Sequence, residues 1–169
     1  MKRSSGRDHR IEPGPRQESV WDYPRPPRLE RTKKTIRIVF NGLTVVETTR
    51  AFRVLETSHP PVYYVPPDDI RSEFLLQGRH GTHCEWKGRA RYVDLKAGDR
   101  TLENAGWYYP EPAAGFEAIR DHVAFYPDGM DRCTVDDEVV TPQPGRFYGG
   151  WITSDIVGPF KGDPGTEFW

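Results

Sequence analysis

The sequence predicts a single, mostly β domain, and three observations carry that prediction. The chain has 169 residues, the length of one domain with one core. Short runs rich in β-branched and aromatic residues recur between residues 35 and 140, and Gly, Pro, Asn and Asp separate them. Only residues 68–76 combine helically spaced apolar residues with signals for the start and stop of a helix.

The strands are expected to pair as hairpins. Asn41-Gly42 stands between runs at 35–40 and 43–49. This dipeptide favours a two-residue type I′ turn, because both turn residues need a positive φ. Gly88 lies between another expected pair. The other strands are expected at 51–56, 62–65, 82–87, 90–95, 101–109, 123–126, 134–135 and 138–140.

One short helix is expected at 68–76. A proline and two acidic residues open the segment, which suits the first turn of a helix. Ile70, Phe74 and Leu75 would share one face, and Gly78 would end the helix.

Composition divides the chain into four parts. Residues 1–18 are rich in Arg, Ser and Pro and are expected to form a disordered basic arm. Residues 19–34 are expected to be an extended, Pro-rich segment packed on the domain. The core domain should cover 35–140. Residues 141–169 hold many aromatic side chains, so they are expected to form an irregular strap packed on the core or on the second subunit of a homodimer.

Composition also argues against several functions. The net charge is −1 and no basic stripe lies beyond residue 34, so nucleic acid is not an expected partner. No apolar run reaches the roughly 20 residues that span a bilayer, so no membrane association is expected. Cys84 and Cys133 cannot form a four-cysteine zinc site. His80 and His83 beside Cys84 leave a weak zinc alternative, but no metal or cofactor is expected and a cytoplasmic location fits best.

Residues before and after the turn at 57–61 form the first candidate group. Glu56 ends an expected strand, and Tyr63 and Tyr64 follow on the next. A carboxylate near tyrosine hydroxyls can transfer a proton or accept a hydrogen bond from a substrate. Glu56 is therefore a candidate catalytic residue with Tyr63 orienting the substrate, and Arg50 and Tyr64 are candidate ligand-binding residues. The alternative is an exposed glutamate beside core tyrosines.

Two further groups follow along the chain. A bulge at Gly88 could turn Lys87 into a cavity, as the second candidate for proton transfer, with Tyr92 as a ligand contact. Trp107 and Tyr109 alternate to one face of a strand and could form a flat wall for a planar ligand. The alternatives are a half-buried hairpin with solvated charges and ordinary core packing.

Five motifs follow one another along the chain. They are Ala51-Phe52-Arg53-Val54-Leu55-Glu56-Thr57, Pro60-Pro61-Val62-Tyr63-Tyr64-Val65-Pro66, Cys84-Glu85-Trp86-Lys87-Gly88-Arg89-Ala90-Arg91-Tyr92, Trp107-Tyr108-Tyr109-Pro110 and Val123-Ala124-Phe125-Tyr126.

Over roughly residues 35–137 this pattern resembles the domain-of-unknown-function 427 family, a bacterial family also labelled NTP-transferase-like. Residues 147–162 resemble extended, actinobacterial-type members. The resemblance implies a β-tent-like fold, in which two small antiparallel sheets meet at an angle with a pocket between them. That fold is similar to the thalidomide-binding domain of cereblon and to methionine sulfoxide reductase B. Those relatives carry a four-cysteine zinc site, which this sequence cannot build.

The sequence leaves several functions open. One is an enzyme that performs metal-free acid–base chemistry on a small polar substrate with Glu56, Lys87 and Tyr63. Another is a binding module in which Tyr64 and Trp107, together with Tyr109, hold a cyclic or nucleoside-like ligand. A third is a structural or interaction protein. A nucleotidyltransferase-like activity finds no paired acidic metal motif and no phosphate loop in the sequence. Burial of the carboxylate and the ammonium in one pocket would favour catalysis.

Overall fold

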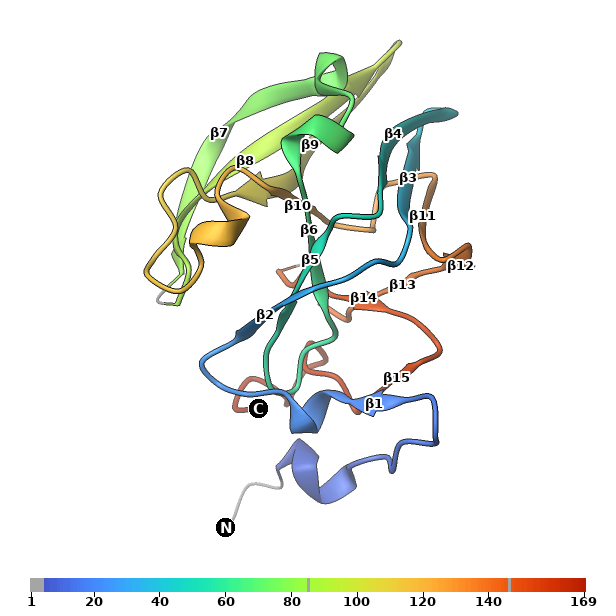
Figure 1. Ribbon diagram of the computed structural model, residues 1–169, viewed down its shortest axis with the longest axis vertical. Coiled ribbons are helices and arrows are strands. Elements are labelled where there is room, and N and C mark those ends of the chain that lie inside the picture. Colours follow the sequence, from blue (N-terminus) through green and yellow to red (C-terminus); the bar gives the residue numbers. More distant parts are fainter. Residues whose placement is uncertain (1–4, 85, 146) are drawn as a thin grey trace.

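The computed structural model describes residues 5–84, 86–145 and 147–169, without the side chains of residues 80 and 82–84. The weak zinc alternative at His80, His83 and Cys84 therefore lies outside the described side chains. Within this description the fold is mostly β, as predicted, and its main sheets are antiparallel (Figure 1).

In the described residues, the larger sheet has seven strands and the smaller has four. In spatial order, the larger sheet contains β2 (Arg28–Arg31), β5 (Phe52–Leu55), β6 (Val62–Val65), β10 (Val123–Phe125), β9 (Arg100–Tyr108), β8 (Gly88–Ala97) and β7 (Leu75–Cys84). The smaller contains β12 (Glu138–Val139), β11 (Arg132–Val135), β3 (Ile36–Phe40) and β4 (Leu43–Thr48). Two short ladders join β1 (Glu18–Ser19) to β15 (Ile156–Val157), and β13 (Thr141–Pro142) to β14 (Trp151–Ile152).

The first hairpin forms as the sequence predicts. Phe40 pairs with Leu43, and the two turn residues Asn41 and Gly42 have φ values of 50° and 74°. These positive angles are those of a type I′ turn, which suits the right-handed twist of the two strands. The hairpin of β3 and β4 therefore starts the smaller sheet.

The prediction of a helix at 68–76 is wrong. The segment contains two short 3-10 turns, η3 (Pro67–Asp69) and η4 (Ser72–Phe74). Between them Ile70 is extended and forms a β-bridge with Val46. Packing against β4 buries Ile70 directly. Contacts with the sheet, and not a helix face, therefore account for the apolar spacing. The other described helical elements are also 3-10 turns: η1 (Gly6–His9), η2 (Val20–Asp22) and η5 (Glu117–Ile119).

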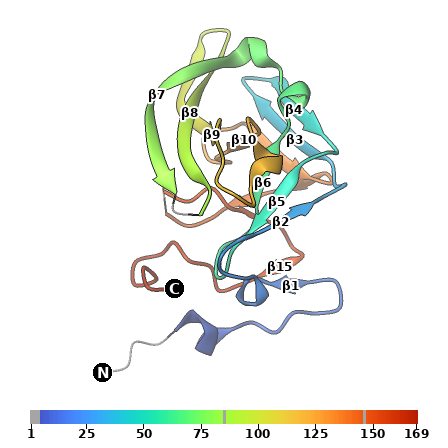
Figure 2. The ribbon, with the colours of Figure 1, turned by 60° about the vertical axis from the view of Figure 1, so that its left-hand side comes forward.

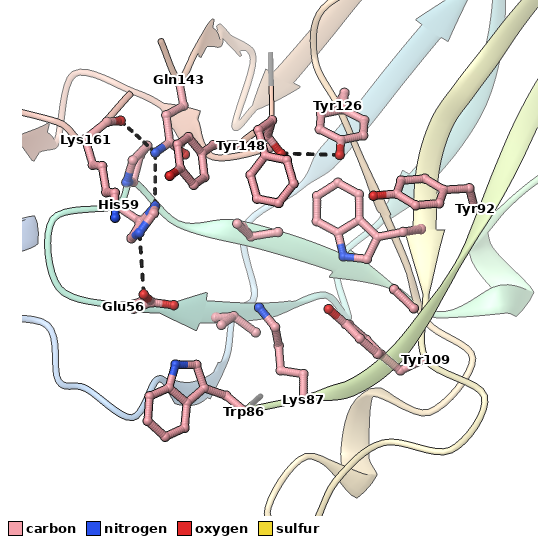
Figure 3. A pocket seen from close by; sticks show the side chains of 17 residues that line it. Glu56, His59, Trp86, Lys87, Tyr92, Tyr109, Tyr126, Gln143, Tyr148 and Lys161 are labelled. Atoms are coloured by element: carbon pink, nitrogen blue, oxygen red, sulfur yellow. Dashed lines mark hydrogen bonds and ion pairs between the residues drawn. The ribbon is translucent and has the colours of Figure 1, made fainter. Parts of the chain in front are cut away.

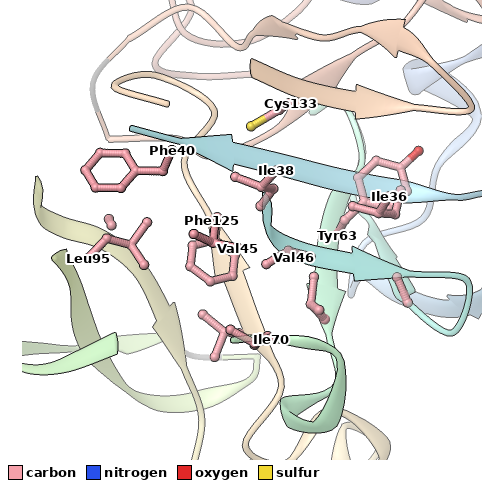
Figure 4. Packing of buried hydrophobic residues seen from close by; sticks show 14 of the residues in the cluster. Ile36, Ile38, Phe40, Val45, Val46, Tyr63, Ile70, Leu95, Phe125 and Cys133 are labelled. Atoms are coloured by element: carbon pink, nitrogen blue, oxygen red, sulfur yellow. The ribbon is translucent and has the colours of Figure 1, made fainter. Parts of the chain in front are cut away.

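The larger sheet buries apolar side chains on both faces. Its first face packs against the smaller sheet, where Ile38 and Phe40 meet Phe125 in the main core (Figure 4). Its second face packs on η5 and carries a separate cluster. Because side chains alternate along a strand, Tyr63 of β6 joins the main core and Tyr64 joins the second cluster.

Residues 5–18 do not form the disordered arm that their composition suggests. Ser5 caps η1, and Gly6 is buried against the rings of Trp21 and Trp169, whose centroids lie 5.4 Å apart. Strand β1 then pairs with β15, so the two terminal segments lie side by side (Figure 2). Long-range aromatic contacts order this segment, and composition alone does not reveal them.

Residues 141–169 run across the domain rather than away from it. Trp151 is 1% exposed, its ring centroid lies 5.3 Å from that of Tyr63, and its indole N–H donates to the carbonyl oxygen of Phe125 over 3.0 Å. The chain then passes through β15 to Trp169. This segment brings polar side chains to the second face of the larger sheet.

Candidate functional site

A cavity of about 350 Å³ lies between the second face of the larger sheet and the C-terminal segment. The resemblance implies a pocket between the two sheets, but the smaller sheet covers the opposite face and that space is filled by the main core. Strands β5, β6, β8 and β9 supply the floor of the cavity (Figure 3). The lining residues are Val54, Glu56, His59, Pro60, Val62, Trp86, Lys87, Ala90, Tyr92, Trp107, Tyr109, Tyr126, Gln143, Phe147, Tyr148, Gly149 and Lys161.

One side of the cavity is aromatic. Trp107 belongs to this side, with its ring centroid 4.8 Å from that of Tyr126, and its indole N–H donates to the hydroxyl of Tyr64 over 3.1 Å. Burial, followed by the neighbouring hydroxyl of Tyr92, raises the pKa of Tyr126 above its usual value. The hydroxyl of Tyr126 is therefore a neutral hydrogen-bonding group at physiological pH, on a wall whose rings can contact a flat ligand.

The other end of the cavity holds a chain of three polar side chains. Gln143 accepts from the backbone N–H of Gly150 over 3.1 Å and donates to the carbonyl oxygen of Lys161 over 2.8 Å. These two backbone groups fix which end of the amide is the NH2 group. That same NH2 group lies 3.0 Å from Nδ1 of His59, so Nδ1 is the acceptor.

The proton of a neutral His59 therefore sits on Nε2. That atom lies 3.4 Å from a carboxylate oxygen of Glu56. Burial, reinforced by the positive charges of Lys161, Arg25 and Lys87, lowers the pKa of His59 to about 3. The ring is thus neutral near pH 7, and it orients Glu56 rather than acting as a base itself.

Cationic side chains surround this polar end. Lys87 lies in the turn between β7 and β8 and points into the cavity (Figure 3). The ammonium of Lys161 donates to the main-chain oxygen of Trp169 over 3.2 Å and lies 5.8 Å from the ring centroid of Tyr148. Arg25, outside the lining, contacts Glu56 at 3.4 Å. Burial and the charge of Arg25 lower the pKa of Lys161.

The structure brings together most of the residues that the sequence singles out. Glu56 and Lys87 line one cavity with the aromatic side chains of Tyr92, Trp107 and Tyr109. Tyr64 lies directly behind Trp107 and contacts it edge to face.

Two predicted site residues lie elsewhere. Tyr63 faces the main core, where it is 2% exposed, because alternation along β6 turns it away from Tyr64. Arg50 forms a two-pronged ion pair with Asp69, at 2.7 and 3.1 Å, at the end of β4. Neither residue lines the cavity.

Four important lining residues were not predicted. His59 stands in a Pro-rich turn that gives no sign of its neighbours in space. Three more, Gln143, Tyr148 and Lys161, belong to the C-terminal segment, for which the sequence predicts only packing. The run of aromatic and glycine residues at 147–151 was the available signal, since close backbone approach to a ring needs glycine.

Two features are absent from the described residues. No group of three or more His, Cys, Asp or Glu side chains in that part of the chain is placed to hold a metal ion. None of its helices is both long and apolar enough to cross a membrane.

The fold and the cavity define an all-β domain with an aromatic pocket bordered by the C-terminal segment. The chain belongs to the family described as Domain of unknown function (DUF427), labelled NTP_transf_9, which it matches over residues 28–136. No curated protein shows significant similarity to it. Gln143, Tyr148 and Lys161 lie beyond the matched residues, so part of this pocket lies outside the segment shared with the family.

Proposed function

We propose that this chain binds a small polar molecule with a flat ring in the cavity between the larger sheet and the C-terminal segment. The proposal rests on one observation: aromatic and polar side chains occupy different sides of the cavity. Trp107, Tyr109 and Tyr126 offer ring surfaces on one side, while Glu56 and His59 form a fixed polar end. Ligand pockets in proteins combine apolar walls with a few fixed polar groups, and their volumes start at about 300 Å³.

Hydrogen bonds within the chain hold this polar end in place. Gln143 uses both ends of its amide on partners from within the chain, and its donor group fixes the tautomer of His59. A site whose groups are already oriented loses less conformational entropy on binding. This supports recognition of a specific ligand rather than a passive surface cleft.

A second candidate function is acid–base catalysis on the bound molecule. Glu56 and Lys87 line the same cavity, and the side chain of Glu56 is only 22% exposed. A carboxylate and an ammonium beside one substrate can serve as proton acceptor and proton donor. Under this hypothesis Glu56→Gln and Lys87→Met each abolish turnover but change ligand affinity by less than about tenfold.

Native mass spectrometry of freshly purified protein tests the binding proposal. We expect a small molecule to remain bound to the wild type and to be released on denaturation. Trp107→Ala should lose it because a ring of the aromatic wall is removed, and Val62→Trp should lose it because a large ring fills the cavity.

Val139→Ala is the matched control, since Val139 is 59% exposed and does not line the cavity. The circular dichroism spectrum should be the same for all variants. Equal retention of the molecule in Val62→Trp and in the wild type would show that the cavity is not the binding site.

A further inference from the structure

Glu56 presents one carboxylate oxygen to the protein and the other to the cavity. The residue directly follows β5, and its side chain is only 22% exposed. One oxygen, Oε2, lies 3.4 Å from the guanidinium of Arg25 and 3.4 Å from Nε2 of His59. The other oxygen points along the cavity toward its aromatic side, where Lys87 and Tyr109 lie (Figure 3). A ligand in the cavity would therefore meet this second oxygen.

The contacts of Oε2 are long for a carboxylate. A charge-assisted hydrogen bond from a cationic N–H to a carboxylate measures about 2.7–2.9 Å, whereas Arg25 and His59 both remain at 3.4 Å. The ion pairs of Arg53 elsewhere in this chain are 2.6 Å long. Arg25 and His59 therefore hold Glu56 in position without using its full capacity, because the two oxygens of a carboxylate can accept about four hydrogen bonds.

The neighbours of Glu56 at the polar end are committed to partners within the chain. Gln143 is 4% exposed, and its NH2 group donates to Nδ1 of His59 and to the carbonyl oxygen of Lys161. Its amide oxygen accepts from Gly150. The remaining N–H of His59 faces Glu56. Of these three linked side chains, Glu56 is thus the one that directs an acceptor into the cavity (Figure 3).

From these contacts we infer that Glu56 determines the specificity of the pocket. The ligand's flat ring carries a hydrogen-bond donor, an N–H or an O–H, that is directed at the cavity-facing oxygen of Glu56. The assignment rests on the proposed function, and it names the ligand group that the polar end recognises. A ring that covers Glu56 displaces water from this oxygen, and only a ring with a donor replaces the lost hydrogen bond. A site built to accept such a bond rejects analogues that lack the donor.

Three probes of nearly equal shape test the inference. Benzofuran has no donor, indole replaces its ring oxygen with N–H, and 5-hydroxybenzofuran adds an O–H. We expect indole, 5-hydroxybenzofuran or both to bind at least about fivefold more tightly than benzofuran in NMR titrations of the full chain at pH 7. The tighter of the two donors then identifies whether the recognised group is an N–H or an O–H.

Variants of Glu56 locate the effect. Glu56→Leu removes both acceptor oxygens, so the preference for a donor-bearing probe should fall below about twofold while benzofuran binding is kept. Glu56→Gln keeps the shape and one acceptor oxygen but loses the charge, so the preference should be smaller than in the wild type without vanishing. Glu47→Leu is the matched control, because Glu47 is 59% exposed on β4 and does not line the cavity. It should keep the full preference.

The outcomes separate this assignment from the proposed function. Equal affinities for all three probes, each lost in Val62→Trp, would overturn the donor assignment and leave the binding pocket intact. A preference that persists unchanged in both Glu56 variants would show that the donor contacts another group, and Glu56 would not determine specificity. If no probe binds in a Val62-dependent way, a donor-bearing ring is not what the pocket recognises. The native mass spectrum then decides independently whether the pocket binds a ligand.

Discussion

Gln143 donates its side-chain N–H to Nδ1 of His59 over 3.0 Å, and this contact joins the C-terminal segment to the polar end of the cavity. The two residues lie 84 positions apart in the sequence. Because Nδ1 accepts this bond, the ring proton lies on Nε2 and faces Glu56. Gln143 lies outside the family-matched segment and His59 lies inside it. Gln143 thus determines which ring nitrogen of His59 carries the proton.

This relationship predicts the titration of His59. In the wild type the nitrogen chemical shifts of His59 should report a neutral ring, protonated at Nε2, down to about pH 4, because burial lowers the pKa of His59 to about 3. Gln143→Glu places an acceptor and a negative charge beside Nδ1, so the pKa of His59 should rise by about 1–3 units. Gln143→Leu removes the donor without adding charge and should leave the ring neutral. An unchanged titration in Gln143→Glu would contradict the tautomer assigned here.

The same low pKa predicts how stability depends on pH. The folded state holds His59 with a pKa of about 3, below the ordinary value near 6.5, so the unfolded state binds more protons between these values. Stability should therefore be constant above about pH 6.5 and should fall as the pH drops toward 3. The slope from this group alone is at most about 1.4 kcal/mol per pH unit. Urea denaturation between pH 4.5 and 8 measures it.

His59→Gln is the variant that tests the source of the slope. It should reduce the loss of stability between about pH 6.5 and 4.5, where the unfolded histidine takes up its proton. His122→Gln is the control, since His122 lies against Phe52 outside the cavity. Identical slopes in His59→Gln and the wild type would assign the pH dependence to other groups.

The sequence predicted those parts of the fold that depend on local signals. Asn41-Gly42 sets the first hairpin because its two residues adopt the required positive φ values. The strand at Val62–Val65 agrees with its predicted boundaries because prolines delimit it on both sides. The expected helix at 68–76 failed because a tertiary bridge between Ile70 and Val46 overrides a helical spacing of apolar residues.

The candidate site was predictable only in part, for a similar reason. Glu56, Lys87 and Trp107 lie in motifs with recognisable local chemistry, and all three line the cavity. Tyr63 and Tyr64 were indistinguishable in the sequence, because strand alternation gives opposite faces but does not say which face bears a pocket. Lys161 reaches the cavity through a long irregular path that no periodic pattern records.

A buried arginine is predicted to hold the N-terminal segment on the larger sheet. Arg53 on β5 forms ion pairs of 2.6 Å with both Glu18 and Glu30, and its side chain is 10% exposed. Arg53→Met should reduce the free energy of unfolding by about 1–3 kcal/mol. The expected loss is no larger because both carboxylates are about 40% exposed, so solvent screens their charges. Chemical denaturation at pH 7 measures the loss.

Removing the carboxylates together with the arginine should recover part of that loss. The triple variant Arg53→Met, Glu18→Gln, Glu30→Gln leaves no uncompensated charge at the junction of β1, β2 and β5. It should be more stable than Arg53→Met alone. A triple variant that is less stable would show that packing of the arginine side chain, and not its charge, holds the segment.

The last prediction concerns the close approach of the C-terminal segment to the aromatic wall. A Cβ atom added to Gly149 would lie 2.3 Å from the ring of Trp107, closer than any real contact. Gly149→Ala must therefore displace the indole or the segment, and overpacking of this kind costs about 1–3 kcal/mol. We expect a lower melting temperature, a changed near-ultraviolet circular dichroism spectrum and weaker ligand retention. Gly14→Ala is the control, because the nearest atom to its added Cβ is the flexible side-chain oxygen of Gln17 at 3.3 Å. If both variants match the wild type in all three measurements, the C-terminal segment does not rest on Trp107 in solution and does not close the cavity.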